Sequence, residues 1–300
     1  MLLKKLAVAG ILSLLQNALL AQGCSDAGFC TIGNFNAIHN KSDKYTGYKN
    51  EADLSYIIAT HSKYERFHQL QVNYRLVKKN GAFYEIRLPF NTAKNINNKV
   101  SNSGIGDGTF TYNNAIKKME YSLGLRISFS SANKGDNKSM IPYPMYLQSG
   151  LGTTDLLGVV NYNILQFLSI GTGVQVPVIQ YNMHEIFIDS TQFVKGKDYR
   201  RQPDALLKLT AHYATGKLKI SSGLITIFHL ANDFYKTSQS KYILQNSEGT
   251  TVNFNIQIAY AFAKNITFDF LYAEPLVTRA NIPDGLARSR IYAPKFIFSF

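Results

Sequence analysis

The sequence predicts an all-β protein, a transmembrane antiparallel up-and-down β-barrel of about twelve strands. Three observations predict it. The chain opens with an export signal, later segments alternate apolar and polar residues over lengths that suit membrane-crossing strands, and the connections are alternately short and long. This combination is typical of the bacterial outer membrane.

The first residues indicate export. Lys4 and Lys5 form a positive start, residues 6–15 form an apolar stretch too short to span a bilayer as a helix, and Ala21 precedes the expected cleavage point. Two alternatives stay open: a lipoprotein with Cys24 as the lipid acceptor, and an uncleaved buried helix. We therefore expect a signal peptide over residues 1–21.

Residues 22–50 form a polar segment before the first expected strand, and residues 51–300 form the barrel. The two cysteines of the chain, Cys24 and Cys30, lie in this segment. In an oxidising periplasm a local pair is most simply a disulfide. The segment as a whole is either a periplasmic tail or a plug within the barrel.

The period of the remaining chain is two. In residues 252–262, valine, isoleucine and aromatic residues occupy one face while asparagine, glutamine and alanine occupy the other. Residues 156–179 carry no charge and could form a helix, but their glycines and amides favour two strands. A soluble β-sandwich also alternates, yet segments of about ten to thirteen residues with aromatic ends favour membrane strands.

Connection lengths give an independent check. The expected strands are 53–64, 67–78, 81–91, 106–117, 119–131, 153–164, 167–179, 204–215, 217–229, 250–262, 265–275 and 288–300. The even connections are short, as periplasmic turns are. The odd connections after the first are long, as external loops are: 92–105, 132–152, 180–203, 230–249 and 276–287. Ten or fourteen strands are the alternatives.

The C-terminal segment supports the same fold. It ends in an aromatic series on one face: Tyr292, Phe296, Phe298 and Phe300. A last strand ending in Phe resembles the signal that the barrel assembly machinery recognises, so we expect that machinery to be a partner.

The formal net charge of +13 would suit nucleic acid or an anionic membrane. The charge is not gathered in one stripe, and exported proteins rarely meet nucleic acid. Outer-membrane lipid and its anionic lipopolysaccharide are the expected partners.

Charged residues on the polar faces are the best candidates for a lumenal solute site. They are Glu85, Arg87, Glu120, Arg126, Lys208, His212, Lys219 and Asp269. Two interpretations remain: a lumen that binds or filters solutes, and a salt-bridge network that fills a narrow barrel.

Catalytic and metal sites are not expected. Within single strands, no serine lies two residues from a histidine, the spacing that would place both on one face for nucleophilic catalysis. The six histidines are scattered without metal-ligand spacing, so we expect neither a metal nor a cofactor.

Several motifs in order resemble a known family. They are Gly-Ile-Gly-Asp at 104–107, Tyr-Ser-Leu-Gly-Leu-Arg-Ile-Ser-Phe at 121–129 and Leu-Gln-Ser-Gly-Leu-Gly-Thr-Thr-Asp at 147–155. The region 50–300 resembles the outer-membrane proteins of the phenol meta-cleavage degradation family, itself similar to fatty-acid and toluene transporter barrels. The chain departs from the family pattern at 130–133.

The resemblance implies passive uptake of small hydrophobic or aromatic molecules, and it implies that residues 22–50 enter the lumen as a hatch. A structural or surface-interaction barrel that uses the connections 180–203 and 230–249 is the first alternative. A lipid-modifying barrel enzyme is the second.

Overall fold

The computed structural model describes residues 50–300 except 61–64, 79, 98, 131, 136–141, 183–184, 190–191, 196–198, 237–239 and 284–289. The expected signal peptide, the expected hatch and both Cys24 and Cys30 lie outside the described residues, so those expectations stay predictions.

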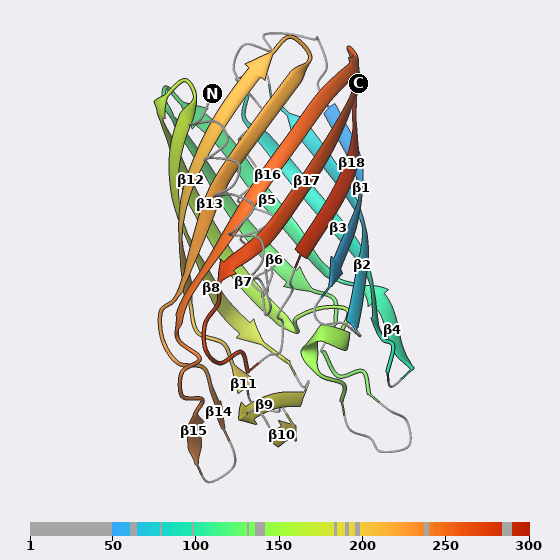
Figure 1. The fold of residues 1–300 in the computed structure, drawn as a ribbon, viewed down its shortest axis with the longest axis vertical. Coiled ribbons are helices and arrows are strands. Elements are labelled where there is room, and N and C mark those ends of the chain that lie inside the picture. The colour runs from blue at the N-terminus through green and yellow to red at the C-terminus, as the bar shows by residue number, and fades with distance from the viewer. Residues whose placement is uncertain are drawn as a thin grey trace, which may run out of the picture.

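Within the described residues, twelve strands form one closed antiparallel barrel (Figure 1). They are β1 (Asn50–Thr60), β2 (Glu65–Val77), β3 (Phe83–Asn95), β5 (Asp107–Ile116), β6 (Met119–Ser128), β7 (Thr153–Leu165), β8 (Leu168–Gln180), β12 (Asp204–Thr215), β13 (Leu218–His229), β16 (Gly249–Ala263), β17 (Ile266–Val277) and β18 (Arg290–Ser299). The predicted fold class and strand number are confirmed.

The first and last strands close the barrel. β1 pairs antiparallel with β18, with Glu51 opposite Ser299 and Thr60 opposite Arg290. Asn50 and Phe300 exchange two backbone hydrogen bonds, each of 3.0 Å. Closure leaves no sheet edge unpaired, which a bilayer requires because it offers no water to unpaired backbone groups.

One predicted connection is wrong in detail. The connection 92–105 is not a loop, because β3 runs on to Asn95 and pairs there with β4 (Val100–Ile105). The strand then breaks at Gly106 and resumes as β5, which pairs with the earlier half of β3. Residues 94–95 and 100–105 are mostly polar and lack an apolar face. The sequence therefore did not predict strands there.

The two ends of the barrel differ as predicted. At one end, where Phe300 lies, two-residue turns such as Lys117–Lys118 and Gly216–Lys217 join the strands. Gly216 has φ +53°, a conformation that glycine adopts without strain. The other end carries the long connections (Figure 1). Barrels of this class keep the short turns in the periplasm, so the long connections are extracellular.

The extracellular connections contain short elements of their own. They are the 3-10 helix η1 (Met145–Leu147), β9 (Glu185–Asp189), β10 (Gln192–Lys195), β11 (Tyr199–Arg200), β14 (Phe234–Lys236) and β15 (Lys241–Ile243). β9 pairs with β10, and β14 pairs with both β11 and β15. Among the described residues, no helix is long and apolar enough to span a membrane.

The two faces of the wall have opposite character. The outward face is apolar: Val72, Leu88, Leu123 and Val174 are each about half exposed. The inward face carries buried carboxylates, guanidinium groups and amides, for example Glu85 and Gln175. An apolar exterior around a polar interior is the reverse of a soluble protein and is the pattern of an outer-membrane barrel. The protein is therefore an outer-membrane β-barrel.

The C-terminal aromatic residues lie on the outward face. Tyr292, Phe296, Phe298 and Phe300 are each more than a third exposed in the absence of lipid. Tyr292 packs beside Tyr272 and Phe296 beside Phe268, with ring centroids 5.3 Å apart in both pairs. Their role as an assembly signal stays a prediction.

Candidate functional site: the lumen and its extracellular mouth

All eight predicted lumenal residues occupy inward positions of their strands. Glu85, Arg87, Arg126, Lys208 and Asp269 are buried, while Glu120, His212 and Lys219 are half-buried. The period of two predicts the face correctly because successive strand residues point to opposite sides. The structure groups these side chains into separate clusters along the wall.

The first cluster is centred on Glu85, which is fully buried. Its carboxylate accepts hydrogen bonds from Arg87 Nε at 2.6 Å and from Arg75 Nε at 3.1 Å. Arg75 also contacts Glu51 at 2.9 Å and Asp53 at 3.9 Å. Three acids and two arginines therefore pair with one another across β1, β2 and β3, with one negative charge in excess.

A second cluster lies nearer the mouth. Arg126 on β6 forms an ion pair with Asp155 on β7, and Gln175 on β8 donates to the same carboxylate. A third cluster joins β16, β17 and β18, where Asp269 contacts Lys295 at 3.1 Å and accepts from Gln257 at 2.6 Å. Each predicted charge here has a partner on the neighbouring strand.

The remaining four predicted residues lie on β6, β12 and β13. Ser169 Oγ on β8 lies 2.8 Å from His212 Nε2. This cross-strand serine–histidine pair was missed because the sequence search considered spacing within one strand only. Among the described residues, Nδ1 of His212 has no hydrogen-bond partner, so no carboxylate orients the ring as a catalytic triad would.

Two of the quoted sequence motifs meet at the mouth. The connection between β6 and β7 returns to the wall at residues 147–152, against residues 104–108. Asn91 donates to the Ser149 carbonyl at 2.5 Å, and the Leu151 amide donates to Asp107 at 3.0 Å. A Cβ at Gly106 would lie 3.0 Å from the Ser149 carbonyl oxygen, so the glycine permits this close approach.

This returning segment carries an apolar surface. Leu147, at the end of η1, packs in a buried cluster with inward residues of β1, β2, β3, β17 and β18: Ala59, Phe67, Ala93, Ala273, Ile291 and Ala293. Tyr143 and Tyr146 pack against the same cluster. The inner wall is therefore apolar at the mouth on this side, although it is charged below.

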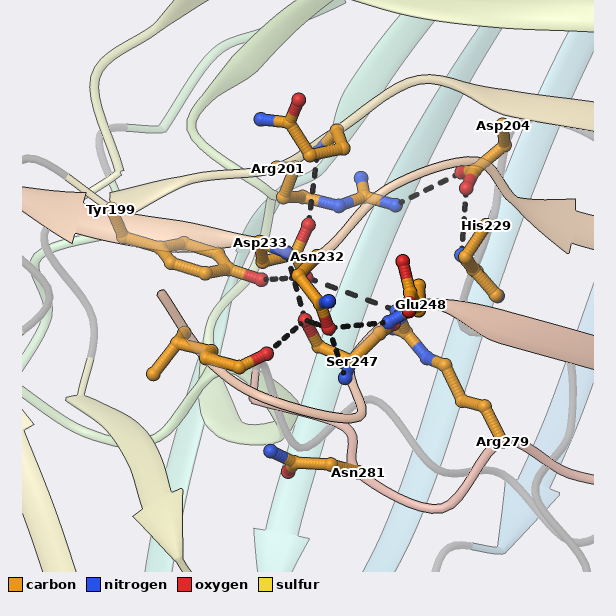
Figure 2. Close-up of polar contacts among 12 residues, drawn as sticks. Tyr199, Arg201, Asp204, His229, Asn232, Asp233, Ser247, Glu248, Arg279 and Asn281 are labelled. Atoms are coloured by element: carbon orange, nitrogen blue, oxygen red, sulfur yellow. Dashed lines mark hydrogen bonds and ion pairs between the residues drawn. The ribbon is translucent and has the colours of Figure 1, made fainter. Parts of the chain in front are cut away.

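A polar cluster ties three extracellular connections together on the opposite side (Figure 2). Asp233 accepts hydrogen bonds from Tyr199 Oη at 2.8 Å and from the Gln202 amide at 2.9 Å. Arg279 lies 3.8 Å from Asp233 and donates to the Ser247 carbonyl at 2.8 Å. The connections after β8, β13 and β17 are thus held by one buried carboxylate.

A shorter contact, between an aspartate and a histidine, lies beside this cluster (Figure 2). Asp204 and His229, the ends of β12 and β13, lie 2.6 Å apart, and Arg201 lies 3.7 Å from Asp204. These residues join the loop cluster to the barrel wall. None of them was among the predicted site residues, because the sequence placed them at strand ends.

Among the described residues, no group of three His, Cys, Asp or Glu side chains could hold a metal ion. The contacts above describe a lumen lined with paired charges and an apolar patch at its mouth.

Comparisons with known proteins agree with the fold. No family model and no curated protein matches the chain. An outer-membrane channel from Pseudomonas putida F1 is similar in structure, with a TM-score of 0.60, 11% identity, and coverage of 84% of this chain and 96% of that chain. This likeness shows the barrel fold.

Two weaker likenesses are to the NanC porin and the CymD monoaromatic hydrocarbon channel. Their TM-scores are 0.45 and 0.41, with 13% and 8% identity. The aligned region covers 84% of this chain in both cases. It covers 98% of the NanC porin and 89% of the CymD channel. The resemblance to the phenol meta-cleavage family stays a hypothesis, since no family model matches the chain.

Proposed function

We propose that the protein is a passive outer-membrane channel for small hydrophobic or aromatic molecules. The observation that carries this proposal is the apolar patch at the mouth, where Leu147 packs on an alanine-rich inner wall. In the structure Leu147, Tyr143 and Tyr146 cover this wall, so its alanines are buried. A hydrophobic solute that displaces this cover meets an apolar surface whose small side chains leave room for it.

The paired charges below the patch suit passage rather than tight binding. Glu85 is held by Arg75 and Arg87, and Asp269 by Lys295. A paired charge presents a weaker field than a free charge, so a small uncharged or weakly polar solute is not trapped.

The test compares two small anions in proteoliposome swelling, aromatic benzoate and non-aromatic gluconate. The wild type should admit benzoate faster than gluconate. Ala93→Phe places a large ring in the alanine wall, and it should slow benzoate severalfold. Ala52→Phe is the matched control because Ala52 lies on the outward face of β1. Equal entry of both anions in the wild type would contradict the proposed selectivity.

A surface-interaction role is the second candidate. The hairpin of β14 and β15 extends beyond the barrel (Figure 1) and exposes Tyr242 and Ile243 by 47% and 52%. Tyr235 stacks on Tyr242 with centroids 4.9 Å apart. An exposed aromatic hairpin is typical of a contact surface. Removing residues 235–242 should abolish adhesion to a partner and leave benzoate entry unchanged if this role holds.

A further inference from the structure

Two basic side chains oppose each other on the outer wall. Arg66 on β2 and Lys94 on β3 are direct cross-strand partners. Both occupy even-numbered positions, which face outward on these strands, as Leu70, Val72, Leu88 and Phe90 do. Like charges directly opposite each other destabilise a sheet, so an anion between them would relieve the repulsion.

No protein carboxylate supplies that anion within the part of the chain that the structure describes. The printed ion pairs of this region, such as Arg75 with Glu85, lie on the inward face. The neighbouring outward arginine, Arg290 on β18, differs because Glu274 lies 3.6 Å from it. Arg290 therefore has its counterion built in, whereas Arg66 and Lys94 have none among the described residues.

A pocket lies directly beside these two side chains. It has a volume of about 310 Å³ and is lined by Tyr56, His68, Leu70, Phe90 and Thr92. The ladder of β2 and β3 orders the layers: Arg66 is opposite Lys94, then His68 opposite Thr92, then Leu70 opposite Phe90. The outward face thus passes from charged to polar to apolar over five residues of each strand.

The polar layer is itself preorganised. Tyr56 Oη lies 2.9 Å from His68 Nδ1, and the two rings stack with centroids 5.9 Å apart. Thr92 Oγ1 lies 3.1 Å from Ser103 Oγ on β4. These hydroxyl groups and the imidazole offer hydrogen bonds just below the charged layer.

We propose that this surface binds a phosphate-bearing lipid of the outer leaflet, the lipid A part of lipopolysaccharide. Arg66 and Lys94 hold one headgroup phosphate, because a guanidinium binds phosphate through two parallel hydrogen bonds and an ammonium adds a point charge. An acyl chain lies in the pocket against Leu70 and Phe90. Their position at the extracellular ends of β2 and β3 places them at the outer leaflet.

The experiment uses the purified full chain in detergent and measures the temperature at which the folded barrel is lost on gels, with and without added lipid A. The test variant is Arg66→Gln with Lys94→Gln, and Arg290→Gln is the matched control. Lipid A should raise the transition temperature of the wild type and the control. At a lipid A concentration that half-saturates the wild type, it should not raise the transition temperature of the double variant. The apparent affinity of the double variant should be about 30-fold weaker, since each basic side chain contributes about fivefold at a membrane surface.

Two further arms identify the headgroup. Lipid A stripped of its phosphates should fail to stabilise the wild type, and inorganic phosphate at the same concentration should also fail. Without lipid, the double variant should be at least as stable as the wild type because the repulsion is gone. Equal stabilisation of wild type and double variant by lipid A would overturn the proposal. So would full stabilisation by the stripped lipid or by inorganic phosphate.

Discussion

Glu85 is the most informative position at which to perturb the lumen. Glu85→Gln keeps the shape and volume of the side chain but removes its charge. The carboxylate is fully buried and contacts two arginines, Arg75 at 3.1 Å and Arg87 at 2.6 Å. Removing one partner of a buried ion pair costs about 3–5 kcal/mol. Because Arg75 keeps Glu51 and Asp53, we expect about 3 kcal/mol.

Urea unfolding in micelles, followed by circular dichroism, measures this loss, since the chain has no tryptophan for fluorescence. Glu248→Gln is the control because Glu248 is an exposed acid in an external connection, and it should leave the unfolding free energy unchanged. Adding Arg87→Gln should recover part of the loss by removing a charge that has lost its partner. A loss below about 1 kcal/mol at Glu85 would refute the reasoning, because it would mean that water already solvates the cluster.

Three further predictions concern the barrel and its loops. Leu123→Arg should lower the unfolding free energy of the barrel by about 2–4 kcal/mol because Leu123 faces lipid, whereas Leu123→Met should not. If both variants lost the same stability in the urea assay, Leu123 would not face lipid. A cysteine at Ser240 should react with an impermeant maleimide on intact cells and one at Gly216 should not, and the reverse labelling would invert the topology. Asp233→Asn weakens the contact with Arg279, so protease should cut the external connections faster while the barrel keeps its unfolding transition. Unchanged cleavage would mean that Asp233 does not hold these connections.

The strands were predictable because the alternation of apolar and polar residues can be seen within each segment of the sequence alone. A membrane strand must alternate, so residues such as Glu85 and Leu88 reveal their faces from position alone. The same parity identifies Asp53, Arg75 and Asp155 as inward, and they would have been found had every strand been read. The turns were predictable because an up-and-down barrel places successive connections at opposite ends, and barrels of this class have short turns at the periplasmic end.

The mouth was not predictable from periodicity. The contact of Ser149 with Asn91 joins residues 58 apart in sequence, and nothing in either segment's pattern indicates the other. The serine–histidine pair of Ser169 and His212 depends on the register between β8 and β12, which is a property of two strands. Such long-range contacts arise only when the barrel closes.

The central claim is that solutes pass through the lumen along the alanine wall. Block of the ionic current by a reagent bound to a lumenal cysteine tests this claim most directly. In a background with Cys24→Ser and Cys30→Ser, single cysteines replace Ala93, an inward residue covered by Leu147, or Lys94, its outward neighbour. Because a solute that passes this wall must displace the cover, a charged thiol reagent added at the extracellular side of a planar bilayer should reduce the current through Ala93→Cys and leave Lys94→Cys unchanged. Equal block of both variants, or no current through either, would contradict a channel that passes the alanine wall.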